Sequence, residues 1–145
     1  MEKFNFRLEP VLKERERKEQ QTALAQVKAH QEYLRRMEEL EATMSHEEQL
    51  METGIGNDSF DAMNKLMYLN VLRSKITKQK KRVNDQQQTL EECRNNAIQA
   101  RKEKLILEKL KQNQYTSFRQ QQNKIEQKEN DEFATLMSMR KHTFS

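Results

Sequence analysis

The chain has 145 residues, of which 34% are charged and 6% aromatic, and it contains no tryptophan. With a mean hydropathy of −1.16, such a chain cannot bury a thick core of several layers. Glycine occurs only twice and proline once, and the abundant residue types are strong helix formers, so the composition predicts long helices and not disorder. The 27 basic and 23 acidic residues leave a net charge of +4. Their alternation is typical of a solvated helix surface and not of a nucleic-acid-binding face.

The sequence also indicates where the protein works. No run approaches the roughly 18 to 20 apolar residues that a membrane-spanning helix needs. The N-terminus, MEKFNFRLEP, lacks the apolar core of a signal peptide. The single cysteine, Cys93, cannot form an internal disulfide. These features favour a reducing, cytoplasmic setting.

The first long helix is expected from about residue 7 to about residue 53. Pro10, the only proline, falls in its first turn, where the missing N–H would have no partner anyway. A seven-residue repeat then predicts the seam of a coiled coil. The repeat consists of Ala23, His30, Met37, Met44 and Met51, with Val27, Tyr33, Leu34 and Leu40 between them. A polar side chain in a seam can fix its register, and we expect this role for His30.

Both glycines lie in the next segment, residues 54–58, which is the only turn signal of the chain. Glycine and asparagine accept the left-handed backbone that ends a helix, and Asp58 or Ser59 can cap the helix that follows. The second helix is expected from about residue 59 to about residue 141. Because a short connection joins two long amphipathic helices, the pattern predicts an all-α antiparallel coiled-coil hairpin. Residues 1–145 are expected to form a single domain.

The second helix carries a clearer repeat than the first. Its predicted seam consists of Ala62, Leu69, Ile76, Val83, Leu90 and Ala97, with Leu66, Leu72, Cys93 and Ala100 beside it. Lys104 occupies the next seam position, and the apolar triplet 105–107 follows it, so the pattern predicts a stutter there. Apolar residues resume at Leu110, Phe118, Ile125, Phe133, Leu136 and Met139.

The helix lengths predict an overhang. Folding at the turn pairs the start of the first helix with the region near Leu105, which leaves the last ~40 residues without a partner in the chain. A single helix with an apolar stripe favours a binding groove or a second chain. The two-helix seam is thin, so we expect the hairpin to be marginally stable alone and more stable when bound.

Residues suited to catalysis or metal binding are scarce. The three histidines lack the spacing of paired ligands, and Cys93 has no local partner. Neither a glycine-rich phosphate loop nor a nucleophile elbow occurs. The sequence therefore predicts no enzyme activity, no cofactor, no metal site and no small-molecule substrate.

Two further clusters lie near the turn. The basic run, residues 73–82, holds six bases and no acid. It suits either a charged flank facing the acids at 38–41 of the first helix or a DNA-binding basic helix, and the flank is favoured because no leucine zipper follows. Methionines occur at 37, 44, 51, 63 and 67. They are expected mainly to fill gaps in the thin core, with a pliable partner surface as the alternative.

Three stretches are more specific than a generic coiled coil. They are Phe4-x-Phe6-x-Leu8-x-x-Val11-Leu12, then Tyr68-Leu-Asn-Val-Leu72-Arg-Ser-Lys-Ile76-Thr-Lys-Gln79, and last Glu126-Gln-Lys128-Glu-Asn-Asp131-Glu132-Phe133-Ala134 followed by Arg140-Lys141. Together with the length and the single turn near one third of the chain, they resemble the bacterial flagellar export protein family FliJ over essentially the whole chain.

The resemblance implies a non-enzymatic stalk of the flagellar type III export apparatus at the cytoplasmic face of the inner membrane. Such a stalk, similar to the γ subunit of F-type ATPases, sits in the pore of the hexameric export ATPase and promotes its assembly. It also connects the ATPase to the membrane export-gate protein, and export chaperones are further partners. The resemblance implies export-gate contact for Tyr68, Leu72, Ile76 and Gln79. It implies ATPase-ring contact for Phe118, Ile125, Gln127, Lys128, Asp131, Glu132, Phe133 and Arg140.

Several alternatives stay open at this point. Leu72 and Ile76 also fall on the predicted seam, so each is either a gate contact or part of the hairpin core. The equivalent stalk of a virulence type III secretion system would share the same physical features. A basic coiled-coil DNA-binding protein and a generic parallel scaffold are alternatives of other classes.

Overall fold

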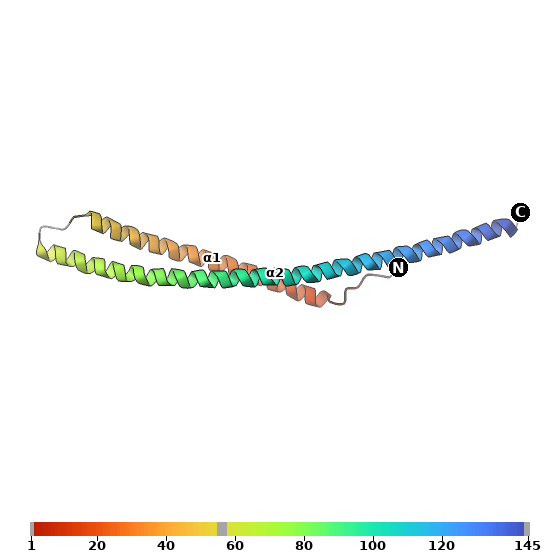
Figure 1. Cartoon of the computed structure of the whole chain (residues 1–145), viewed down its shortest axis with the longest axis horizontal. Helices are drawn as coiled ribbons and strands as arrows, with labels where there is room; N and C mark the ends of the chain where they lie inside the picture. Colours follow the sequence, from red (N-terminus) through yellow and green to blue (C-terminus); the bar gives the residue numbers. More distant parts are fainter. Residues whose placement is uncertain (1, 55–57, 144–145) are drawn as a thin grey trace. The chain divides into compact units, whose positions relative to one another are not determined.

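Two long α-helices make up nearly all of the computed structural model, which describes residues 2–54 and 58–143 (Figure 1). Helix α1 spans Glu9–Glu52 and helix α2 spans Ser59–Thr143, against expected ranges of about 7–53 and 59–141. The helices pack against each other as a hairpin, and α2 is the longer, with 85 residues against 44. The predicted all-α hairpin is therefore confirmed.

Contacts within the chain divide it into two units. The hairpin unit comprises Arg17–Ala100, and the terminal unit comprises Met1–Glu16 with Arg101–Ser145. In the hairpin unit, Gln86 Nε2 donates a hydrogen bond of 3.1 Å to the Ala29 carbonyl. Nearer the turn, Arg73 Nε of α2 lies 3.4 Å from Glu47 Oε1 of α1. A residue with a higher number on α1 thus faces a residue with a lower number on α2, so the two helices are antiparallel in this unit.

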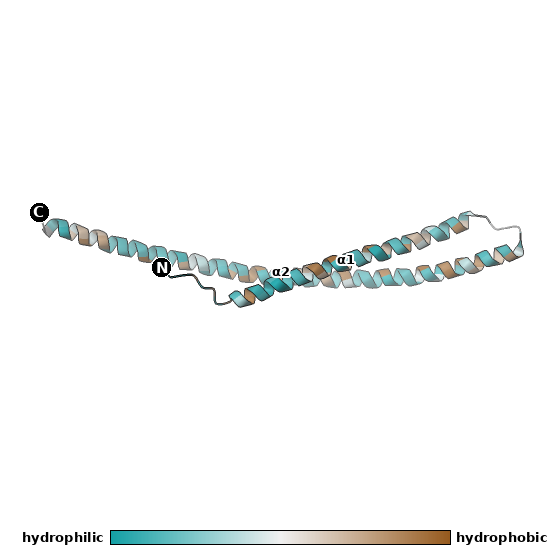
Figure 2. Ribbon diagram, turned by 180° about the vertical axis from the view of Figure 1, so that it is seen from behind, coloured by the Kyte–Doolittle hydropathy of each residue, from teal (hydrophilic) through white to brown (hydrophobic). Residues whose placement is uncertain are grey.

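The core of the hairpin unit is one thin seam. Leu40, Ile76 and Val83 form a buried cluster, and Tyr33 and Met37 pack against it. Figure 2 shows hydrophobic residues interspersed with hydrophilic ones along both helices, as expected when each helix contributes only a stripe to the interface. Accordingly, none of the described large side chains is completely buried.

The seam of α2 follows the predicted seven-residue repeat. Its members are buried or half-buried: Ala62, Leu69, Leu72, Ile76, Val83, Leu90, Cys93, Ala97 and Ala100. Leu66 is an exception, because its side chain is exposed. Large aliphatic side chains at a strict spacing of seven explain the agreement.

The seam of α1 differs from the prediction. Most members of the predicted repeat are exposed, namely Ala23, His30, Met44 and Met51. The stripe that faces α2 also recurs every seven residues, at Ala29, Arg36, Thr43 and Leu50. Small and polar side chains give a weak apolar signal, so the neighbouring methionine stripe dominated the sequence pattern. The expected role of His30 in the seam is therefore wrong, and a buried polar side chain that does bond across the interface is that of Gln86.

The stutter predicted at residues 105–107 is also wrong. In the terminal unit Lys104 and Lys111 are half-buried, whereas the first two residues of the apolar triplet are exposed. The contact positions thus keep the spacing of the repeat. A charged residue can occupy such a position when its charge is paired. Lys111 meets this condition, because its Nζ lies 2.8 Å from Glu9 Oε2.

The N-terminal segment, residues 2–8, extends the pairing along α2 within the terminal unit. The ring centroid of Phe4 lies 5.3 Å from that of Tyr115 and 5.6 Å from that of Phe118. Beyond this contact every described side chain of Asn123–His142, here called the C-terminal extension, is exposed. The exposed length is shorter than expected, because the sequence-based pairing left the N-terminal segment out.

Local hydrogen bonds define the helix ends beside the turn. Asp58 caps α2, since its Oδ1 accepts a bond of 3.2 Å from the Phe60 backbone N–H. Lys65 of α2 donates to the Thr53 carbonyl and so brings a positive charge to the C-terminus of α1, whose last turn has no basic residue. Gly54 does not have the left-handed backbone expected of it. The rest of the expected glycine turn, residues 55–57, lies outside the described residues.

Candidate partner-binding surfaces

The exposed side chains near residue 60 and in the C-terminal extension are the features most able to contact other molecules. Within residues 2–54 and 58–143, no three His, Cys, Asp or Glu side chains gather into a group that could hold a metal ion. Cys93 is a free thiol, half-buried in the hairpin seam. Neither described helix has an apolar stretch long enough to span a bilayer.

The four residues expected at the export gate lie in different environments. Leu72 and Ile76 are 5% and 7% exposed and belong to the hairpin seam. Tyr68 is 45% exposed, and its ring lies 5.6 Å from that of His46, nearly edge-on. Gln79 is half-buried, and its Oε1 has no hydrogen-bond partner among the described residues. These four residues therefore do not form one exposed patch.

Another face of the same part of α2 carries an exposed apolar stripe. Phe60, Met63, Met67 and Val71, here called the hairpin outer surface, are each more than 60% exposed. They recur at intervals of three or four residues, which places them on one face of the helix. The methionines of this surface were expected mainly in the core, with a pliable partner surface as the alternative, because methionine gives the same apolar signal in a core and on a surface. Of the five methionines near the turn, only Met37 packs against the buried cluster.

The basic run, residues 73–82, is only partly neutralised in the hairpin unit. Arg73 Nε lies 3.4 Å from Glu47 Oε1. The acids at 38–41 were expected to meet Arg73, but residues at equal distances from the turn face each other, which brings Glu47 to that level. The four lysines of the run are exposed and have no ion-pair partner among the described residues. They leave a positive surface beside the hairpin outer surface.

One carboxyl group of α1 has a strongly lowered pKa. Glu32 accepts hydrogen bonds from Arg35, at 2.5 and 3.0 Å, and from Arg36, at 3.0 Å. These bonds lower the pKa of Glu32 to about 2. All three residues lie within two turns of one helix, so the network supports the helix surface locally.

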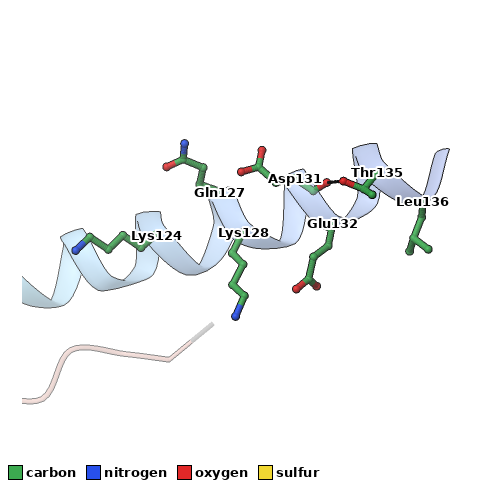
Figure 3. Close-up of a pocket in the computed structure, with 7 residues that line it drawn as sticks. All are labelled: Lys124, Gln127, Lys128, Asp131, Glu132, Thr135 and Leu136. Atoms are coloured by element: carbon green, nitrogen blue, oxygen red, sulfur yellow. Dashed lines mark hydrogen bonds between the residues drawn. The ribbon is translucent and has the colours of Figure 1, made fainter. Parts of the chain in front are cut away.

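The residues expected at the ATPase ring fall into two groups. Phe118 packs beside Phe4 and takes part in the contacts of the terminal unit. The others are exposed on the C-terminal extension: Ile125, Gln127, Lys128, Asp131, Glu132, Phe133 and Arg140. A shallow hollow there is lined by Lys124, Gln127, Lys128, Asp131, Glu132, Thr135 and Leu136 (Figure 3). All of its walls come from one helix, so it is an open surface.

A two-helix hairpin whose longer helix continues as an exposed, partly apolar segment defines a class of coiled-coil proteins that work through contacts with other proteins. The comparisons with known proteins narrow this class, because the model of a family described as the flagellar FliJ protein matches residues 4–143. The chain belongs to the flagellar FliJ family. It is accordingly a non-catalytic component of the flagellar export apparatus. No curated protein and no solved structure matched the chain.

Proposed function

We propose that this protein is the stalk of the flagellar type III export ATPase. The C-terminal extension enters the pore of the hexameric ATPase and promotes its assembly, while the hairpin unit contacts the membrane export gate. The protein works at the cytoplasmic face of the inner membrane, and export chaperones are further partners. The observation that carries this proposal is the exposed apolar stripe of the C-terminal extension in a member of the FliJ family.

The energetics of the C-terminal extension favour a partner. Ile125, Phe133, Leu136 and Met139 are each at least 50% exposed. Full burial of one such side chain is worth roughly 1.5–3 kcal/mol relative to full exposure. A helix that lays its apolar stripe into a groove gains this free energy. The pore of a ring-shaped ATPase would supply walls that the chain itself does not provide.

The test places charges on the stripe of the full-length chain. We expect the double variant Phe133→Asp/Leu136→Asp to lose promotion of hexamer formation and of ATP turnover, because each carboxylate would be buried without a partner. Ser138→Asp, an exposed position of the same segment on another face, is the control and is expected to behave as wild type. Sedimentation of the ATPase and phosphate release are the measurements. A double variant that promotes hexamers as well as wild type would contradict the stalk proposal.

For the export gate we propose contact through Tyr68 and the hairpin outer surface. Leu72 and Ile76 would then act from the core by holding the two helices together. Met67→Asp and Val71→Asp are expected to weaken binding to the gate protein without lowering the melting temperature, because both side chains are more than 60% exposed. Thr89→Asp, exposed further along α2, serves as the control. Unchanged gate binding would refute this contact and leave the ATPase contact untouched.

A further inference from the structure

Charged residues interrupt the apolar stripe of the C-terminal extension. Glu129 follows Ile125 by four positions and precedes Phe133 by four, and Glu132 precedes Leu136 by four. Side chains three or four positions apart lie on one face of a helix. The two carboxylates therefore stand within the stripe and not on the opposite side.

Figure 3 shows this sidedness at the second carboxylate. The side chains of Glu132 and Leu136 project to one side of α2, and those of Asp131 and Gln127 project to the other. Asp131 and Glu132 are adjacent, both are exposed and both carry one negative charge. They differ in the direction in which that charge points.

Neither carboxylate of the stripe has an ion-pair partner among the described residues. Water solvates Glu129 and Glu132 while the extension is free. A groove that covered Ile125, Phe133 and Leu136 would displace this water. Lys128 projects to the same side as Glu132 (Figure 3) and can pair with only one of the two carboxylates. Burying an ionised carboxylate without a partner is costly, so a groove that accepts the stripe must supply positive charge at this level.

We infer that the groove receiving the C-terminal extension is apolar and carries arginine or lysine side chains that pair with Glu129 and Glu132. This inference rests on the proposed function, in which the groove is the pore of the export ATPase. Arg140 follows Leu136 by four positions and brings the opposite charge to the same stripe, so an acidic group of the groove faces it. Charges of both signs at fixed levels set how far the helix inserts, because a shifted helix would bury them unpaired.

The test compares two charge reversals in the full-length chain, E129K and E132K, with S138K, which adds a positive charge at an exposed position on another face of the same segment, as the control. The dissociation constant for the ATPase hexamer is measured by titration with labelled protein at two salt concentrations. We expect E129K and E132K each to weaken binding by at least about 30-fold and S138K by less than about 3-fold. Wild-type binding should also weaken as salt rises. Equal weakening by S138K would show that added positive charge alone matters and would overturn the inference.

The double variant Phe133→Asp/Leu136→Asp separates this inference from the stalk proposal. If it loses binding while E129K and E132K bind as wild type, the stalk proposal stands and the basic groove is refuted. If it binds as tightly as wild type, the extension is not inserted, and both proposals fail. Melting curves of all variants are expected to match wild type, since the substituted side chains are exposed.

Discussion

Replacing Leu72 by alanine tests whether this residue is part of the hairpin core. Leu72 is 5% exposed, whereas its neighbour Val71 is 63% exposed. Truncating a buried leucine costs ~2–5 kcal/mol. We expect about 2–3 kcal/mol at Leu72, the lower end of that range, because a two-helix seam can partly close over the lost volume. Val71→Ala is the matched control and should change stability by less than ~0.5 kcal/mol.

Thermal and urea unfolding followed by circular dichroism measure this difference. For a chain of this length, ~1 kcal/mol shifts the melting temperature by roughly 2–4 °C, so Leu72→Ala should lower it by about 4–12 °C. The urea midpoint should fall while the slope stays constant, which identifies a loss of stability rather than a change in the denatured state. If Leu72→Ala and Val71→Ala had equally small effects, the placement of Leu72 in the seam would be refuted. If Leu72 is core, the folded variant should also bind the export gate as wild type does.

Three further predictions concern the hairpin unit. Gln86→Ala removes a buried hydrogen bond between the helices and should lower the free energy of unfolding in urea by ~1–2 kcal/mol; an unchanged midpoint would contradict this. Gly54→Ala should alter the melting temperature very little, because a Cβ there meets nothing within 4 Å and the backbone is not left-handed; a clear loss would show that the glycine is required. Arg35 helps to hold the pKa of Glu32 at about 2, against 4.5 ordinarily, so the ionised network contributes above pH 4.5 and is lost as the pH falls to 2. Glu32→Gln should therefore lower the melting temperature at pH 7 and not at pH 2, and equal effects at both pH values would be evidence against the network.

The two helices differ in how far their packing could be predicted from the sequence. On α2 the seam residues are mostly large and aliphatic, such as Leu69 and Val83, and they stand out from a polar background. On α1 the seam contains Arg36 and Thr43, while Met44 lies exposed beside it. Apolar periodicity finds a seam only when the seam is more apolar than the neighbouring faces. In α1 that condition does not hold.

The candidate surfaces, too, could be predicted from the sequence only in part. The apolar stripe of the C-terminal extension could be predicted, because its spacing is local to one helix and the side chains described there remain exposed. The exposure of Met67 and the burial of Leu72 depend on which face α2 turns towards α1, and that choice involves both helices. The contact between Phe4 and Tyr115 joins distant parts of the sequence, so no local pattern reveals it. The only local signal was the pair of aromatic residues near the N-terminus, Phe4 and Phe6.

The packing of Phe4 against Tyr115 and Phe118 also makes position 4 a place for an optical probe. The chain has no tryptophan, so Phe4→Trp would introduce a single indole fluorophore without background from other sites. That indole would lie beside aromatic rings just ahead of the C-terminal extension. Its emission would report the occupancy of the extension in real time, without a dye attached to the surface that the partner must cover.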